Sequence, residues 1–141
     1  MSVYADTSFF VSIYIKDTHS KNADELLRSG YRPSFTPLHA AEWAHAVAQQ
    51  VFRGKMSVAE AQSVQLDLMN DLAADLWQQV QMPDNAFELC ADLARRYGPK
   101  LGVRTLDTLH VACALELKAE RFWTFDERQA KLAKAEGLKI A

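Results

Sequence analysis

The sequence predicts an α/β protein in which helices cover both faces of a central, short-stranded parallel sheet, so that the fold has three layers, α/β/α. The main observation is that short apolar runs alternate along the chain with longer amphipathic stretches. Strands that alternate with helices in this way form parallel β-α-β units with right-handed crossovers. The length of 141 residues is typical of one domain with one hydrophobic core. We therefore expect a single domain over residues 1–141.

The first part of the chain contains two expected strands and two expected helices. Residues 3–5 form a short apolar run that predicts a strand. Ser8 is expected to cap the helix that follows and reaches Ile15, because a serine hydroxyl can accept a hydrogen bond from the first helical turn. A second helix is expected over residues 19–28. Residues 34–36 lie between two prolines and predict a second, extended segment.

Two longer helices are expected in the middle of the chain. The first begins near Leu38 with apolar residues at helical spacing, and Gly54 ends the pattern. Ser57 and Glu60 have the spacing of a capping box, which opens the second helix. Its apolar stripe continues to Leu76, so we expect a surface helix with one buried face.

The C-terminal part repeats the alternation of strands and helices. Asp84, Thr105 and Asp126 each precede an apolar-periodic stretch and are expected to cap three helices. The first of these helices is expected to end at Gly98 and Pro99, because proline interrupts helical hydrogen bonding. The remaining expected strands are residues 78–82, 121–125 and 138–140.

The composition excludes several classes of protein. The chain is 49% hydrophobic and 24% charged, which is typical of a folded globular protein and excludes a disordered or fibrous one. Sixteen Lys and Arg against eighteen Asp and Glu give a net charge of -2, so no overall cationic field attracts nucleic acid or a membrane. A nucleic-acid partner would have to be bound through a local patch or through metal ions.

The cysteines and the N-terminal residues favour a cytoplasmic protein. Cys90 and Cys113 lie in separate helical stretches without metal-ligand spacing, and we expect both to be free thiols in a reducing compartment. The first residues lack a basic segment before an apolar one. The apolar run over residues 9–15 is too short to span a bilayer, so we expect no contact with a membrane.

Four carboxylates stand at positions that favour a functional role. Asp6 and Asp126 directly follow expected strands, and ligands bind beyond the carboxyl ends of strands in open parallel sheets. Asp107 lies in the first turn of its helix, and Glu42 lies among alanines and a tryptophan on a helix poor in charge. Each acid alone is typical of a cap or a solvated charge. Brought together, the four would repel one another unless a divalent cation such as Mg²⁺ or Mn²⁺ bound them.

The same residues are part of a larger pattern. The segments in question are Tyr4-Ala5-Asp6-Thr7-Ser8, Ala41-Glu42, Thr105-Leu106-Asp107-Thr108-Leu109-His110 and Thr124-Phe125-Asp126. In order and spacing they resemble the PIN domain, in particular the VapC-type toxin ribonucleases of prokaryotic toxin-antitoxin pairs. The resemblance covers essentially the whole length of the chain.

The resemblance implies a metal-dependent endoribonuclease that hydrolyses RNA phosphodiester bonds. By this resemblance, one or two Mg²⁺ or Mn²⁺ ions would be bound by the catalytic carboxylates of Asp6, Glu42, Asp107 and Asp126. Thr7 and Thr124 would supply accessory hydroxyl groups beside them. The resemblance also implies a homodimer and a small cognate antitoxin as protein partners.

A local cationic run is a candidate for contacts with the RNA backbone. Arg95, Arg96, Lys100 and Arg104 form the densest group of positive charge in the sequence. Basic side chains of this kind hold phosphates through charge-assisted hydrogen bonds. The same residues are equally consistent with a solvated helix end, so both interpretations stay open at this point.

Three other functions compete with the nuclease. Glu42-x-x-His45 and Asp107-x-x-His110 each place a carboxylate and an imidazole on one helical face, as in di-iron helical proteins, but the prolines and expected strands argue against such a bundle. Phosphatases and receiver domains also carry an acid after the first strand, yet Asp6 is followed by threonine and serine instead of a further acid. A non-catalytic RNA or protein interaction module on the same fold is the third alternative.

Large aromatic side chains indicate either a full core or an interface. They are Trp43, Phe52, Trp77 and Trp123. Core packing is the ordinary role of such residues, and an interface with a partner protein is the alternative.

Overall fold

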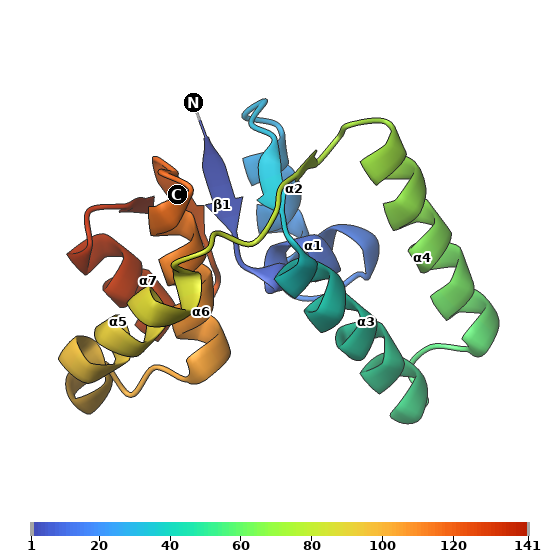
Figure 1. Ribbon diagram of the computed structural model, residues 1–141. Coiled ribbons are helices and arrows are strands. Elements are labelled where there is room, and N and C mark those ends of the chain that lie inside the picture. Colours follow the sequence, from blue (N-terminus) through green and yellow to red (C-terminus); the bar gives the residue numbers. More distant parts are fainter. Residues whose placement is uncertain (1, 141) are drawn as a thin grey trace.

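The computed structural model describes residues 2–140, and it has the expected three-layer α/β/α architecture (Figure 1). Within this range five parallel strands form one sheet in the order β3-β2-β1-β4-β5. The strands are β1 (Val3–Ala5), β2 (Pro33–Phe35), β3 (Gln78–Gln79), β4 (Arg121–Trp123) and β5 (Lys139–Ile140). The order places β1 in the centre, between β2 and β4, so the prediction of a central parallel sheet is confirmed.

The described residues contain seven helices, which lie in two groups. They are α1 (Thr7–Tyr14), α2 (Ser20–Leu27), α3 (Pro37–Phe52), α4 (Val58–Ala73), α5 (Ala86–Leu101), α6 (Thr105–Glu116) and α7 (Glu127–Ala135). Figure 1 shows α5, α6 and α7 on one side of the sheet and α1 to α4 on the other. The connections between parallel strands therefore cross on both faces of the sheet, as expected for this class.

The sheet divides the buried residues into two hydrophobic cores, one on each face, where the length of the chain predicts one. Tyr4 and Phe122 point toward the core shared with α5, α6 and α7. Their strand neighbours Val3, Ala5 and Trp123 point toward the core shared with α1, α3 and α4. This is the two-residue period of a β-strand, in which successive side chains lie on opposite faces. Strands this short are stabilised because both of their faces are buried.

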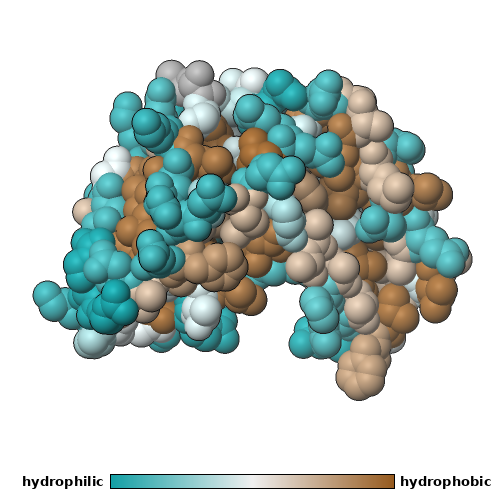
Figure 2. Space-filling view, in the orientation of Figure 1, coloured by the Kyte–Doolittle hydropathy of each residue, from teal (hydrophilic) through white to brown (hydrophobic). Residues whose placement is uncertain are grey.

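The structure shows which of the large aromatic side chains lie in a core and which is exposed. Trp43, Trp77 and Trp123 are at most 2% exposed and belong to the core of α1, α3 and α4. Phe52, at the end of α3, is 86% exposed. Figure 2 shows apolar side chains over the α3 and α4 region, and further exposed apolar residues there are Val58, Leu66 and Met69. Core packing is thus confirmed for the three tryptophans.

Two predicted helix boundaries, the start of α1 and the end of α5, differ from the structure. Asp6, instead of Ser8, caps α1, because its carboxylate accepts hydrogen bonds from the Ser8 backbone and hydroxyl at 2.9 and 3.0 Å. Pro99 lies inside α5, which continues to Leu101 and ends at Gly102 with φ 64°. Leu101 packs against the core, so burial of the last turn outweighs the one backbone hydrogen bond that proline cannot donate.

The caps of α5 and α6 also differ from prediction. Asn85, not Asp84, holds the cap position of α5, and Arg104, not Thr105, holds that of α6; neither side chain makes a capping hydrogen bond. The expected capping box of Ser57 with Glu60 is present at α4. The apolar stripe of α4 ends at Ala73, before Leu76.

Two further sequence predictions are tested by the structure. Cys90 and Cys113 are both buried and free of disulfides, as expected. Across residues 2–140, none of the helices combines the length and apolar character that crossing a bilayer requires.

Candidate functional site

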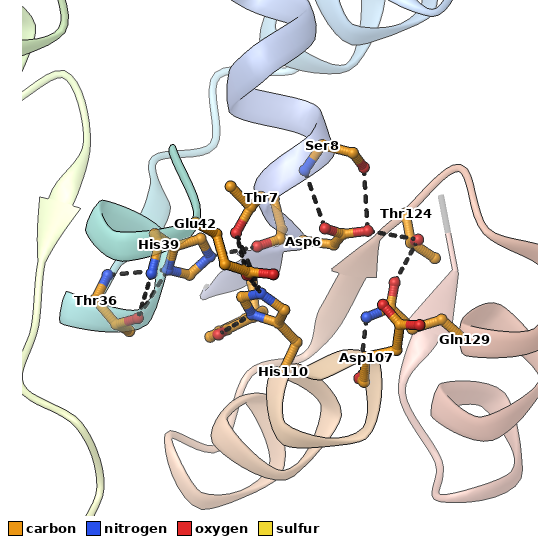
Figure 3. Close-up of polar contacts among 12 residues, drawn as sticks. Asp6, Thr7, Ser8, Thr36, His39, Glu42, Asp107, His110, Thr124 and Gln129 are labelled. Carbon is orange, nitrogen blue, oxygen red and sulfur yellow. Dashed lines mark hydrogen bonds and ion pairs between the residues drawn. The ribbon is translucent and has the colours of Figure 1, made fainter. Parts of the chain in front are cut away.

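The candidate site lies where the central strands β1 and β4 end. The chain leaves β1 at Asp6, whose backbone N–H donates to the carbonyl of Trp123 at 2.9 Å. Thr124 follows β4, and its hydroxyl lies 3.2 Å from Asp6 Oδ2 (Figure 3). Two positions 118 residues apart in the sequence thus meet because parallel strands end at the same edge of the sheet. On this side the space-filling view is hollowed between the α5 and α6 region and the α3 and α4 region (Figure 2).

Asp6, Glu42 and Asp107 line one groove at this edge, together with Thr7. We call it the acidic groove; its volume is about 360 Å³. A second groove of about 520 Å³ is lined by Asp107 and Asp126. Asp107 belongs to both grooves and therefore links Asp126 to the other acids. We call this second groove the outer groove. The four predicted carboxylates thus line two adjoining grooves, and Asp126 lines only the outer groove.

Glu42 is held by hydrogen bonds from two residues of other helices. The hydroxyl of Thr7 donates to Glu42 Oε1 at 2.7 Å, and His110 Nε2 contacts the same oxygen (Figure 3). His110 is only 1% exposed. Its other ring nitrogen, Nδ1, lies 2.6 Å from the hydroxyl of Tyr4. Both ring nitrogens of His110 are thus engaged, Nδ1 by the Tyr4 hydroxyl and Nε2 by Glu42.

The pKa of Glu42 reflects this pairing. Burial by itself would raise the pKa of a carboxyl group. Here the hydrogen bond from His110, the charge of that ring and the hydroxyl of Thr7 act in the opposite direction and lower the pKa below its ordinary value. Glu42 is therefore held as a carboxylate, with Oε1 bonded to protein donors.

A second buried histidine, His39, supports the same edge of the sheet. Its Nδ1 accepts a hydrogen bond from the Thr36 backbone N–H at 3.0 Å, and its Nε2 donates to the carbonyl of Ala5 at 2.7 Å. Burial first, and the neighbouring His110 ring second, lower the pKa of His39 to about 3. A neutral His39 thus ties the start of α3, which carries Glu42, to the residue directly before Asp6.

Asp107 lies in a contrasting environment. Burial is the largest cause that raises its pKa above the ordinary value, followed by the nearby charges of Asp126 and Asp6. Arg104 forms an ion pair with it: the Arg104 Nε lies 3.8 Å from Asp107 Oδ2, and the Arg104 side chain is 88% exposed. An exposed ion pair at this distance contributes little. The negative charges around Asp107 are therefore only weakly compensated by the protein.

Asp126 and Thr124 are connected to Asp107 through a buried glutamine. Asp126 caps α7, because its Oδ1 accepts from the backbone N–H of Gln129 at 2.9 Å. The Gln129 side chain is fully buried; its Oε1 accepts from the Thr124 hydroxyl at 2.6 Å and its Nε2 donates to the Asp107 carbonyl at 3.0 Å. Gln129 thus fixes the starts of α6 and α7 relative to the end of β4.

Three of these supporting residues, His39, His110 and Gln129, were not predicted from the sequence as part of the site. Only His110 had a signal, because its spacing from Asp107 places both on neighbouring turns of one helix. The sequence favours a helix-face or partly buried residue at this position over a metal ligand. The structure buries His110 and pairs it with Glu42.

The predicted phosphate contacts are distributed unevenly. Arg104 lines the outer groove together with Arg128, which the sequence did not single out. Arg96 is engaged by Asp92 at 3.0 Å and Glu136 at 3.3 Å on the other side of α5. Arg95 and Lys100 are exposed and line neither of the two grooves. Arg104 is therefore the member of the predicted group that the structure brings to the acids.

The donor set suits a hard divalent cation. Carboxylate and hydroxyl oxygens are the ligands that Mg²⁺ and Mn²⁺ prefer, and burial first, with the charges of Asp126 and Asp6 second, raises the pKa of Asp107. Among residues 2–140, no three acidic, histidine or cysteine side chains are already gathered in a metal-ligand arrangement. The residue types therefore fit such an ion, but no three of the described side chains lie close enough together to bind it in this arrangement.

Comparisons with known proteins agree with this architecture. The chain is similar to a chain in the crystal structure of VapBC2 from Rickettsia felis bound to a DNA fragment from their promoter, with a TM-score of 0.68 and 17% identity over 100% of this chain and 98% of that one. It is also similar to a chain in the crystal structure of FitAcB from Neisseria gonorrhoeae, with a TM-score of 0.71 and 14% identity over 98% and 95% of the two chains. No curated protein sequence matches the chain.

A comparison with protein families identifies the fold directly. The model of the PIN domain matches residues 3–135, which include every strand except β5 and all of the helices described above. The matched range also contains the four acids at the edge of the sheet. The chain belongs to the PIN domain family.

Proposed function

We propose that the protein is a Mg²⁺- or Mn²⁺-dependent endoribonuclease and the toxin of a type II toxin-antitoxin pair. The observation that carries the proposal is the acidic groove, in which Asp6, Glu42 and Asp107 converge at the carboxyl edge of the sheet. A groove lined by carboxylates repels the anionic backbone of RNA unless cations lie between them. Membership of the PIN domain family and the two toxin-antitoxin complexes of similar fold support the same function.

The four acids share one task in this proposal, which is to bind metal ions. Asp6, Glu42, Asp107 and Asp126 would hold one or two divalent ions. Such ions supply Lewis-acid polarisation of a phosphodiester and acidify a water for in-line attack. The chain itself fixes the acids: Ser8 and Thr124 orient Asp6, and Thr7 and His110 hold Oε1 of Glu42.

The protein supplies few other groups for hydrolysis. Among the described residues of the acidic groove, the hydroxyls of Thr7 and Ser8 already donate to carboxylates. Arg104 and Arg128 in the outer groove are placed to bind a phosphate of the same strand through charge-assisted hydrogen bonds. Arg95, Arg96 and Lys100 would at most guide RNA from a greater distance.

The proposal includes the setting of the reaction. The protein acts as a single domain over residues 1–141, as a homodimer, and in the cytoplasm, where RNA is the available substrate. Its second partner is a small antitoxin. This partner is proposed by analogy with the two solved complexes, whose names are those of toxin-antitoxin pairs.

The test is cleavage of RNA by the purified protein. We expect the protein, freed of any antitoxin, to cut a single-stranded RNA in Mg²⁺ or Mn²⁺ and to stop when EDTA removes the ion. Asp107→Asn keeps the shape of the side chain and removes its charge, and it should lower the cleavage rate about 100-fold or more. Asp84→Asn, an exposed acid outside both grooves, is the matched control and should cut normally.

Growth provides the second readout of the same test. Production of the protein alone should arrest growth of the host cell, and production of Asp107→Asn should not. Cleavage that continues at full rate in EDTA, or a folded Asp107→Asn that cuts as well as the parent, would overturn the metal-nuclease proposal. A folded protein that binds RNA without cutting it would favour the interaction module instead.

A further inference from the structure

A stacked pair of aromatic rings lies beside the acidic groove: His19 is exposed, and Phe125 is partly buried against the core of α1, α3 and α4. The imidazole of His19 lies on the phenyl ring of Phe125 with ring centroids 4.4 Å apart and an angle of 4° between the ring planes. His19 lines the acidic groove, and Phe125 lines the outer groove. Asp107 lines both, so the stacked pair lies at the junction of the two hollows.

The loop that carries His19 is exposed yet tightly held. Asp17 accepts from the His19 backbone N–H at 2.8 Å and from the hydroxyl of Ser12 at 2.8 Å. Ser20 accepts from the Asp17 backbone N–H at 2.9 Å and donates to the Ser12 carbonyl at 2.7 Å. Ser12 is 2% exposed, so the whole network is anchored in the core of α1. The backbone at His19 is therefore held in place, and the stack on Phe125 orients its ring.

Phe125 is fixed from the other side. It lies between Thr124 and Asp126 in the short connection from β4 to α7, and the Thr124 hydroxyl accepts from the Asp126 backbone N–H at 3.0 Å. The same hydroxyl contacts Asp6. The stacked pair is thus tied through the residue next to it to the carboxylate at the end of β1.

We infer that His19 and Phe125 form a stacking site for one unpaired nucleobase of the RNA, next to the phosphodiester that is cut. The inference rests on the proposed nuclease function and adds how its substrate is held. Unpaired bases stack on aromatic and histidine rings, and every base offers a face for this contact. Arg104 and Arg128 lie in the adjoining groove and suit the phosphate beside such a base. A base in a continuous duplex cannot reach these rings, so the site selects single-stranded or looped RNA.

The inference gives different expectations for three variants of one residue. His19→Ala removes the stacking face and should raise the KM for single-stranded RNA about 5- to 160-fold, which is the range for stacking of single bases. His19→Phe keeps an aromatic face and should restore a KM near that of the parent. His19→Leu keeps side-chain volume without a π face and should resemble His19→Ala. His45→Ala, an exposed histidine on α3 outside both grooves, is the control.

A substrate with a missing base separates stacking from a structural role. RNA strands that carry one abasic nucleotide are prepared for each position on either side of the cut bond. At the position whose base stacks on His19, removal of the base should raise the KM of the parent as much as His19→Ala raises the KM for intact RNA. The two proteins should then cut the abasic RNA equally well. The fluorescence of a 2-aminopurine base at that position should be quenched by the parent and not by His19→Ala, with Ca²⁺ in place of Mg²⁺ so that the RNA binds without being cut.

The outcomes distinguish the inference from the function on which it rests. If the parent does not cut RNA, the proposed function fails. If the parent cuts RNA and His19→Ala has the same KM, the stacking site is wrong. It is also wrong if His19→Ala raises the KM for intact RNA and for every abasic RNA by the same factor. Melting temperatures of all variants show whether each remains folded.

Discussion

Glu42 and Asp107 line the same groove, but the protein treats their charges in opposite ways. Glu42 receives hydrogen bonds from Thr7 and His110, and its pKa is lowered despite burial. Asp107 is half-buried near Asp126 and Asp6, and its pKa is raised by burial first and by these charges second. Arg104, its ion-pair partner, is 3.8 Å away and exposed. One side of the groove is therefore stabilised by the fold, while the other holds charge that the fold does not compensate.

The difference shows how one site serves both stability and function. Buried donors such as His110 stabilise the protein whether or not a ligand is bound, because they satisfy a charge that would otherwise be costly to bury. Clustered carboxylates cost stability, and they persist where another group compensates them. We therefore assign the positioning role to the side of Glu42 and the strongest attraction for a cation to the side of Asp107.

The largest effect is expected when the Glu42 side loses its central donor. His110→Ala removes the histidine partner of the Tyr4 hydroxyl, leaves Glu42 with the Thr7 hydroxyl alone and opens a cavity, so it should lower the free energy of unfolding by about 3 kcal/mol. Urea unfolding followed by circular dichroism measures this loss. His45→Ala, which changes an exposed histidine on α3, should change it by less than about 0.5 kcal/mol. A loss at His110 as small as that of the control would show that the network does not stabilise the fold.

The second largest change in the free energy of unfolding is expected when Glu42 loses its charge but keeps its shape. Glu42→Gln keeps the size and loses the carboxylate, and at pH 7 it should lower the free energy of unfolding by about 1 to 2 kcal/mol, because charge-assisted hydrogen bonds are lost. The folded-state pKa of Glu42 lies below its ordinary value of 4.5, so its contribution is present above pH 4.5 and is lost as the pH falls through the folded-state pKa. The gap between parent and variant should therefore close in acid, and a gap independent of pH would contradict the assignment.

The third effect concerns the cation. At a Mg²⁺ concentration ten times its dissociation constant, binding to the folded state alone should stabilise the protein by about 1.4 kcal/mol. Thermal unfolding with and without Mg²⁺ measures the shift, and isothermal titration measures the binding. Asp6→Asn and Asp107→Asn should lose most of both signals, whereas Asp84→Asn should keep them. Equal Mg²⁺ binding by Asp6→Asn would remove Asp6 from the ligands.

The smallest effect has the opposite sign to that at Glu42. In EDTA at pH 7, Asp107→Asn should raise the free energy of unfolding by about 0.5 to 1 kcal/mol, because it removes a carboxylate that its neighbours repel. The folded-state pKa of Asp107 is above its ordinary value of 3.8, so the parent loses stability as the pH rises from 3.8 through the folded-state pKa. The advantage of the variant should therefore vanish below pH 3.8. A destabilised Asp107→Asn would show that Arg104 compensates the charge after all.

The sequence itself determined the fold class and the placement of the four acids on it. Apolar runs of strand length alternating with amphipathic helices predict a parallel sheet, and acids directly after strands predict a site at its carboxyl edge. Asp6 and Asp126 stand there for that local reason: each follows a strand and caps the next helix. Local spacing likewise predicted the capping box of Ser57.

Only the tertiary structure decided what holds those acids. The pairing of His110 with Glu42 joins residues 68 positions apart, and the contact of Thr124 with Asp6 joins residues 118 apart. Helical periodicity records which face of a helix is apolar, but α6 is buried over seven consecutive residues from Thr108 to Ala114 and so has no single apolar face that would give its orientation. The partners of His110 were fixed when α3 and α6 packed against the ends of β1 and β4, because contacts between distant segments depend on how helices and sheet are arranged in space.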